Sequence, residues 1–186
     1  MVQMLLAIAG KPGSGKSAVA EKLARFFNLE LVSFGVAFRR KAKEMNFSLE
    51  EFERYAEEHV EVDKKIEEEQ LKLIKKGNCV VDSRLGGHLA WKENVPSIKI
   101  YLKASLDVRA KRVAKRESIE MERAKLLVEE RERSEKKRYR EFYSIDIDDL
   151  SLYDLIINSE LLTEEGLFEA VRTFIVNCRM PDGREL

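Results

Sequence analysis

The sequence predicts an α/β fold in which a five-stranded parallel sheet carries helices on both faces. Five short apolar runs have the length and composition of buried strands, and segments with helical periodicity separate them. Alternation of strands and helices favours right-handed crossover connections, which produce parallel sheets covered on both sides. Neither a Pro/Gly-rich linker nor an internal repeat interrupts the 186 residues, so we expect a single domain.

The individual elements follow from the same periodicities. Strands are predicted over residues 4–9, near Val32, and over residues 79–81, 98–102 and 155–157. Helices are predicted over residues 17–27, 36–46, 62–76, 105–116 and 121–142, from Ser48 on, and from Thr163 to near residue 176. Ser48 and Glu51 form a capping-box pattern that begins a helix. Gly77 is placed to end the helix predicted over residues 62–76.

Composition excludes several classes of function. A formal net charge of zero gives no reason to expect nucleic acid as a partner, and no apolar run approaches the roughly 20 residues that span a bilayer. Two cysteines, Cys79 and Cys178, make no disulfide framework. We therefore expect a cytoplasmic protein that binds neither membranes nor nucleic acids, and we expect a monomer.

A glycine-rich loop follows the first predicted strand and precedes an amphipathic helix. It has the pattern G-x-x-x-x-G-K-[ST] and comprises Gly10, Lys11, Pro12, Gly13, Ser14, Gly15, Lys16 and Ser17. Glycines let several backbone N–H groups converge on an anion at a helix N-terminus. Lys16 can neutralise the β- and γ-phosphates, and the Ser17 hydroxyl can bind Mg²⁺. The loop therefore predicts an ATP site; Lys11 is not required by the pattern, although it can reach a phosphate.

Arginines indicate a second anion near this loop. Arg39 and Arg84 follow the second and third predicted strands, at the carboxyl edge of the sheet where ligands bind in open α/β folds. Arg131 and Arg138 share one helical face. GTPases are excluded because the base-reading N-K-x-D is absent, and large ATPases need a longer chain. Small-molecule kinases are the leading class.

The chain resembles the nucleoside monophosphate kinases and, among them, the short archaeal-type cytidylate kinases. The resemblance rests on the phosphate loop, on Ser33-x-Gly35-x-x-Phe38-Arg39, on residues 131–139 and on residues 143–158. It covers nearly the whole chain. It implies the three-layer sandwich of the P-loop NTPases, with a core over residues 1–32, 77–112 and 146–176. It also implies an acceptor-binding module at about 33–76 and a LID at about 113–145. Independently of the resemblance, residues 177–186 are expected to form a loose tail.

The resemblance also implies roles for particular residues. Lys16, Arg131 and Arg138 would be catalytic. Beside the Mg²⁺ site expected at Ser17, Asp82 could hold a magnesium-bound water or cap the loop. The acceptor, CMP or dCMP, would contact Ser33, Gly35, Phe38, Arg39, Arg84 and Glu135. Asp63 and Gln70 could read the base, although solvent-exposed positions are favoured for both.

One segment departs from the family pattern. Short archaeal-type members read Glu-Gly-Arg-Leu-Ala-Gly-Trp, whereas this chain has the seven residues Asp82, Ser83, Arg84, Leu85, Gly86, Gly87 and His88. The departure leaves other acceptors open, namely UMP, AMP or a compound like shikimate. A nucleotide-binding regulator without turnover and an RNA-associated protein are further alternatives. The intact Lys16 and arginine set argues against the first, and the glutamates interleaved in 109–140 argue against the second.

Overall fold

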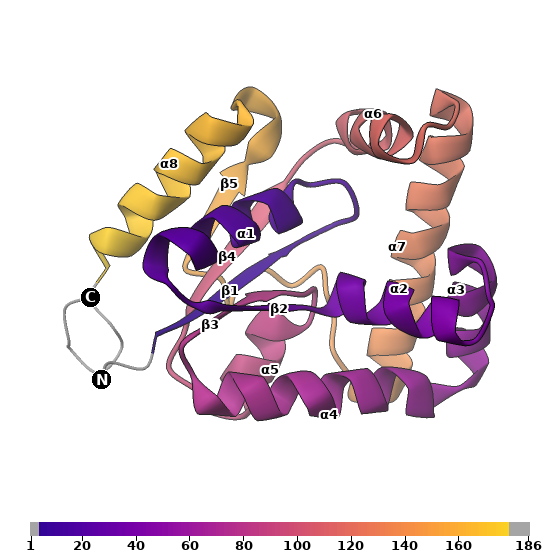
Figure 1. The fold of residues 1–186 in the computed structure, drawn as a ribbon, viewed down its shortest axis with the longest axis horizontal. Coiled ribbons are helices and arrows are strands. Elements are labelled where there is room, and N and C mark those ends of the chain that lie inside the picture. The colour runs from indigo at the N-terminus through magenta and orange to yellow at the C-terminus, as the bar shows by residue number, and fades with distance from the viewer. Residues whose placement is uncertain (1–3, 179–186) are drawn as a thin grey trace.

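Five parallel strands form one sheet at the centre of the protein. The computed structural model describes residues 4–178. In spatial order the strands are β2 (Glu30–Ser33), β3 (Cys79–Asp82), β1 (Leu5–Gly10), β4 (Ile98–Lys103) and β5 (Leu155–Asn158). Every pairing is parallel. The predicted fold class is therefore confirmed (Figure 1).

Helices connect the strands, and most lie where the sequence predicts them. They are α1 (Lys16–Phe27), α2 (Phe34–Glu44), α3 (Leu49–Glu58), α4 (Val60–Lys76), α5 (Gly86–Lys92), α6 (Leu106–Glu117), α7 (Met121–Tyr143) and α8 (Glu164–Val176), with a 3-10 turn η1 (Ser159–Leu161). The Ser48–Glu51 capping box is present at the start of α3. The short helix α5 was not predicted. Except for residues 177 and 178, the predicted loose tail lies outside the described residues.

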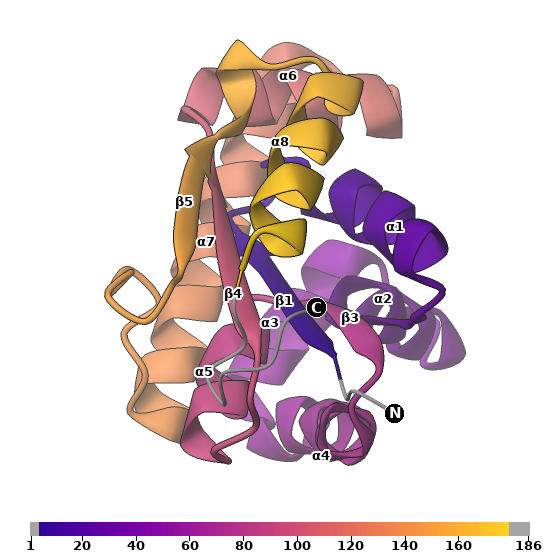
Figure 2. The same cartoon turned by 90° about the vertical axis from the view of Figure 1, so that its left-hand side faces the viewer.

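Two hydrophobic layers hold helices against opposite faces of the sheet. On one face α1 and α8 pack on Leu6, Ile8 and Ile100. On the other face α4, α5 and the end of α7 pack on Leu5 and Val81. Alternate strand residues thus point to opposite sides, as expected for a sheet that is buried on both faces (Figures 1 and 2).

Two helical excursions stand beyond the carboxyl edge of the sheet. Helices α2, α3 and α4 enclose a small core of their own around Phe38 and Phe52. Helices α6 and α7 pack against each other at a steep crossing angle and meet at Ala110 and Val128. Helix α3 also packs against α7, so segments far apart in sequence lie side by side (Figure 1).

The strand register brings three functional segments together. Asp82, the last residue of β3, is aligned with Ile8 of β1 on one side and with Ser33 of β2 on the other. The loops that follow β1, β2 and β3 therefore open at the same edge of the sheet. Among residues 4–178, no helix has the length and apolar character needed to span a membrane.

Candidate active site

The glycine-rich loop between β1 and α1 adopts backbone conformations that need glycine. Gly13 has φ +79°, and an added Cβ would lie 2.5 Å from the carbonyl oxygen of Arg109. Gly10 has φ +148°, where a Cβ would lie 2.5 Å from the carbonyl oxygen of Leu102. The loop can therefore curl tightly against α6 and β4, leaving the N-terminus of α1 open toward the cavity.

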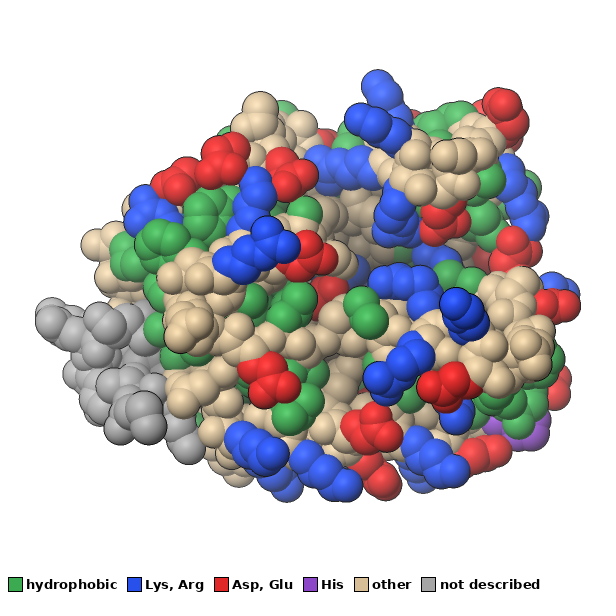
Figure 3. All heavy atoms as spheres, in the orientation of Figure 1, with side chains coloured by type: hydrophobic (Ala, Val, Ile, Leu, Met, Phe, Trp, Pro, Cys, Tyr) green, Lys and Arg blue, Asp and Glu red, His purple; other side chains and the backbone are tan. Residues whose placement is uncertain are grey.

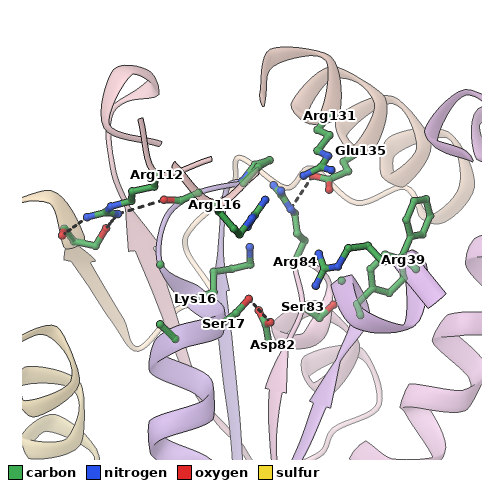
Figure 4. A pocket seen from close by; sticks show the side chains of 18 of the residues that line it. Lys16, Ser17, Arg39, Asp82, Ser83, Arg84, Arg112, Arg116, Arg131 and Glu135 are labelled. Atoms are coloured by element: carbon green, nitrogen blue, oxygen red, sulfur yellow. Dashed lines mark hydrogen bonds and ion pairs between the residues drawn. The ribbon is translucent and has the colours of Figure 1, made fainter. Parts of the chain in front are cut away.

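Lys16 lies at the floor of that cavity, below several arginines (Figure 4). Desolvation, followed by the nearby positive charge of Arg84, lowers the pKa of Lys16 to about 8. The ammonium group thus has less favourable surroundings than it would have in water. A bound polyphosphate would supply the missing negative charge.

Two hydroxyl groups converge on one carboxylate beside Lys16. Ser17 Oγ donates to Asp82 Oδ2 at 2.7 Å, and Ser33 Oγ donates to the same oxygen at 3.0 Å. Hydroxyl and carboxylate oxygens are the ligands that Mg²⁺ prefers, and it usually keeps several waters and substrate oxygens as well. Within residues 4–178, no group of three or more His, Cys, Asp or Glu side chains could hold a metal ion without such help. These residues fit Mg²⁺ bound together with a nucleotide.

Arginines from four segments surround the same space. A cavity of about 610 Å³ is lined by Lys16 and Ser17 and by Arg39, Arg84, Arg116 and Arg131. In Figure 4 the guanidinium groups of Arg84, Arg116 and Arg131 lie above the Lys16 ammonium group, and that of Arg39 lies beside it. Lys and Arg side chains also gather around a hollow between α1, α2 and α6 on the surface (Figure 3). Such a concentration of positive charge is suited to more than one phosphate group.

Arg39 is exposed, as Arg116 is, and it makes no hydrogen bond or ion pair within the part of the chain that the structure describes. Partial burial, and then the charges of Arg116 and Arg131, lower its pKa. Its guanidinium lies next to Gly35, whose missing side chain leaves room for it. The sequence predicted Arg39, Gly35 and Phe38 as acceptor-binding residues, and all three line the cavity.

Arg84 and Glu135, also predicted to bind the acceptor, pair with each other. Arg84 Nε lies 2.7 Å from Glu135 Oε2, and both side chains are nearly buried. Ser83, which stands where the family has glycine, uses its hydroxyl to accept a hydrogen bond from Leu85 N at 3.2 Å. The loop after β3 is thus fixed by its own side chains while both charged groups still line the cavity.

Arg138 occupies a different setting from the other predicted arginines. Its side chain is 1% exposed; Nη1 donates to both oxygens of Asp63 at 2.7 Å, and Nη2 donates to Glu53 at 2.8 Å. Arg131 makes looser contacts, 3.9 Å from Glu53 and from Glu117. Arg138 therefore ties α7 to α3 and α4 in this conformation, whereas Arg131 is freer to bind a ligand.

The prediction that Asp63 and Gln70 are exposed to solvent was wrong. Asp63 is fully buried against Arg138 and does not line the main cavity. Gln70 is 4% exposed and faces a separate cavity of about 290 Å³ between β2, α2 and α4. Sequence reasoning also missed Glu53, which lines the main cavity from α3.

Arg109 and Arg112 support the phosphate loop from behind. Arg109 Nη1 donates to the carbonyl of Pro12 at 3.2 Å. Arg112 donates to the carbonyl of Gly13 at 3.3 Å and to Ser159 Oγ at 2.9 Å. These bonds hold the loop to α6 and η1, so we interpret the two arginines chiefly as supports of the loop.

Three buried carboxyl groups lie beside Arg138 and predict a pH effect on stability. Desolvation raises the pKa of Asp63 to about 6, of Glu53 to about 7 and of Glu67 to about 8. The folded protein holds these protons more tightly than the unfolded chain, so their stabilisation is lost as pH rises through these values. We expect the melting temperature to fall by roughly 2–5 °C between pH 6.5 and pH 8, as calorimetry would measure.

Glu67→Gln provides the control for this prediction. Glutamine does not titrate, so the variant should lose the upper part of the pH dependence. The chosen range runs from the ordinary pKa of His88, 6.5, whose lowered pKa has the opposite effect on stability, to the pKa of Lys16, about 8, so both groups titrate mainly outside it. A melting temperature that rises from pH 6.5 to pH 8 would contradict the prediction.

Comparison with known proteins identifies the family. The sequence model of the cytidylate kinase-like family matches residues 5–161. The chain belongs to the cytidylate kinase-like family. The cytidylate kinase of Methanocaldococcus jannaschii is 44% identical over 95% of this chain and 99% of its own length. The cytidylate kinase of Pyrococcus horikoshii is 43% identical over 93% of this chain and 88% of its own.

Solved structures support the fold. An uncharacterized protein from Eubacterium ventriosum superposes with a TM-score of 0.70 at 20% identity, covering 95% of this chain and 100% of that one. Shikimate kinase from Acinetobacter baumannii, in complex with shikimate, superposes with a TM-score of 0.58 at 14% identity, covering 94% and 93%. At such identities the likeness concerns the fold.

Proposed function

We propose that this kinase transfers the γ-phosphoryl group of ATP to the phosphate of CMP or dCMP, giving ADP and CDP or dCDP. The observation that carries the proposal is a single cavity that joins the phosphate loop to Arg39, Arg84 and Arg131. Such a cavity can hold two phosphorylated molecules end to end. The relatives named cytidylate kinase, at up to 44% identity, support a cytosine nucleotide as the acceptor.

The chemistry requires alignment more than it requires a base. An acceptor phosphate is already anionic near neutral pH, so its oxygen can attack the γ-phosphorus in line without a strong general base. The barrier then depends on holding two anions together and on compensating the charge that spreads over the transferred group. Arginines suit this task because they stay charged and bind oxygens in pairs.

Each part of the cavity receives a role in this proposal. Backbone N–H groups of the loop from Gly10 to Ser17, with Lys16, bind the β- and γ-phosphates. Ser17 and, through water, Asp82 hold Mg²⁺, which would neutralise charge between the phosphates. Arg39 and Arg84 bind the acceptor phosphate, and Phe38 lies beside its nucleoside. Ser33, bonded to Asp82, links the two halves.

We also propose that the two excursions move. Helices α2–α4 correspond to the acceptor-binding module expected over residues 33–76, and α7 with the end of α6 corresponds to the LID expected over 113–145. Closure would bring Arg131 onto the transferring phosphate and exclude water, which limits ATP hydrolysis. Arg138, expected to share this role, is held by Asp63 and Glu53, so we assign it a positioning role.

The test is ADP release from ATP and Mg²⁺ with CMP, dCMP, UMP, AMP and shikimate in parallel. We expect CMP and dCMP to stimulate turnover most strongly. The likeness to shikimate kinase from Acinetobacter baumannii, at 14% identity, supplies no argument for shikimate as an acceptor. A preference for AMP or shikimate would contradict the acceptor, and stimulation by none of the five would contradict the kinase assignment. Cytoplasmic location and a monomeric state stay predictions.

A further inference from the structure

A glutamate of α3 lies in the part of the cavity that belongs to the acceptor side. Glu53 lines the cavity together with Phe34, Phe38 and Leu49, whereas Lys16 enters from the start of α1. Helices α3 and α1 stand on different sides of the structure (Figure 1). If the acceptor phosphate binds at Arg39 and Arg84, its base extends toward these aromatic and aliphatic side chains and reaches Glu53.

The carboxylate of Glu53 is a hydrogen-bond acceptor that lies beside two arginine guanidinium groups. Its side chain is 12% exposed, Oε2 accepts from Arg138, and Oε1 lies 3.9 Å from Arg131 Nε. Arg138 Nε is buried and has no hydrogen-bond partner within the described part of the chain. One carboxylate edge and an adjacent guanidinium edge thus line the same region of the cavity.

The hydrogen-bonding groups of this region complement the base edge of one of the two pyrimidines. Cytosine presents the N4 amino group, a donor, next to N3, an acceptor, whereas uracil presents O4, an acceptor, next to N3–H, a donor. A carboxylate facing N4 with a guanidinium facing N3 or O2 satisfies cytosine. With uracil, the carboxylate would instead face the O4 acceptor, and these buried polar groups would be left without hydrogen bonds.

We propose that Glu53 distinguishes cytosine from uracil in the acceptor by accepting a hydrogen bond from N4. The inference rests on the proposed function and adds the residue that selects the base. Asp63 and Arg138 act as positioning residues, because Asp63 holds Arg138 and Arg138 holds Glu53. Adenine carries the same order of amino group and ring nitrogen, so the informative comparison is CMP with UMP.

Ionisation of Glu53 is part of this selectivity. Burial and the neighbouring Glu135 raise the pKa of Glu53, whereas Arg138, Arg131 and Arg84 lower it; the balance is about 7. Asp63, on α4, faces the same carboxylate across Arg138. A protonated Glu53 would carry one donor and one acceptor, and it could then pair with either pyrimidine. Selectivity for CMP should therefore decrease as pH falls from 8 to 6.

The decisive variant is Glu53→Gln, because an amide can present its donor and acceptor in either order. We expect the ratio of kcat/KM for CMP to that for UMP to fall about tenfold or more, chiefly through KM for CMP. Glu57→Gln is the matched control: Glu57 lies one turn further along α3, pairs with Lys137 at 3.1 Å and does not line the cavity. Its ratio should stay at the wild-type value.

The outcomes separate this inference from the proposed function. A wild-type enzyme that phosphorylates CMP, with an unchanged CMP/UMP ratio in folded Glu53→Gln, would overturn the role of Glu53 alone. A wild-type enzyme that phosphorylates neither nucleotide would overturn both. If Glu53→Gln fails to fold, the wild type decides: equal kcat/KM values for CMP and UMP at pH 8 would overturn the inference.

Discussion

Lys16→Met is expected to reduce CMP-dependent ADP formation by about 10²–10³-fold or more while the fold survives. The side chain supplies the positive charge at the floor of the phosphate loop, in a site where desolvation strengthens its interaction with a developing negative charge. Methionine retains most of the length and apolar character of the side chain. The loss should therefore reflect missing charge compensation and not a collapsed loop.

The same substitution should raise the melting temperature. The pKa of Lys16 is lowered, so the folded state disfavours the ammonium form at neutral pH and removing the charge relieves that cost. Lys72→Met, a change on the exposed face of α4, is the control. It should change neither the activity nor the melting temperature. Near-normal turnover by Lys16→Met would contradict the assigned role of the phosphate loop.

Arg138→Met is expected to lower the free energy of unfolding by about 3–5 kcal/mol. Asp63 is fully buried and takes both of its hydrogen bonds from Arg138, so the variant leaves a carboxylate without a partner in the interior. Urea unfolding followed by circular dichroism measures the effect. The loss should be larger at pH 8 than at pH 5.5, because protonation of Asp63 removes the unpaired charge.

Two further variants separate the lost charge pair from lost packing. Asp63→Leu combined with Arg138→Met removes both charges and should recover most of the stability lost by the single variant. Arg138→Lys keeps the charge but cannot bridge Asp63 and Glu53 together, so an intermediate stability is expected. A single Arg138→Met variant as stable as the wild type would show that the buried pair does not hold α7 to the acceptor-side helices.

The elements nearest the phosphate could be predicted from sequence because local rules determine them. The spacing of Gly10, Gly15, Lys16 and Ser17 leaves few alternatives, and an apolar strand before the loop fixes its place in the sheet. The positions of Arg39 and Arg84 followed from the rule that parallel strands end at a common edge. Helix α5 was not predicted, and its two consecutive glycines, Gly86 and Gly87, disfavour a helix by propensity. A Cβ on Gly86 would lie 2.7 Å from Val81, so close packing of α5 on β3 accounts for that glycine.

The buried acids could not be predicted because their environment comes from distant parts of the chain. Residues 44–70 are strongly acidic, a pattern typical of a solvent-exposed helical surface. Asp63 and Glu53 are buried since Arg138, 75 and 85 residues further on, packs between them. Helical periodicity gave α3, α4 and α7 separately but carried no information about how their charged faces meet. The same limit concealed Glu53 as a residue of the cavity.

The pairing of Arg84 with Glu135 bears on whether both substrates bind before the phosphoryl group is transferred. Both groups line the cavity, so an acceptor phosphate that binds Arg84 must compete with Glu135 or join it. Asp82 connects Ser17 of the donor side to Ser33 of the acceptor side through one oxygen. The two halves of the site therefore share charged groups, which favours a reaction in which both substrates are bound before transfer.

The most direct measurement is the fate of the γ-phosphate when the protein is given γ-labelled ATP, Mg²⁺ and CMP. The account predicts that the label appears in CDP in amounts equal to the ADP formed, and that little appears as inorganic phosphate. It also predicts that Lys16→Met abolishes this transfer. Label that accumulates as inorganic phosphate whether or not CMP is present, with none in CDP, would contradict the assignment of the cavity as a site for two substrates.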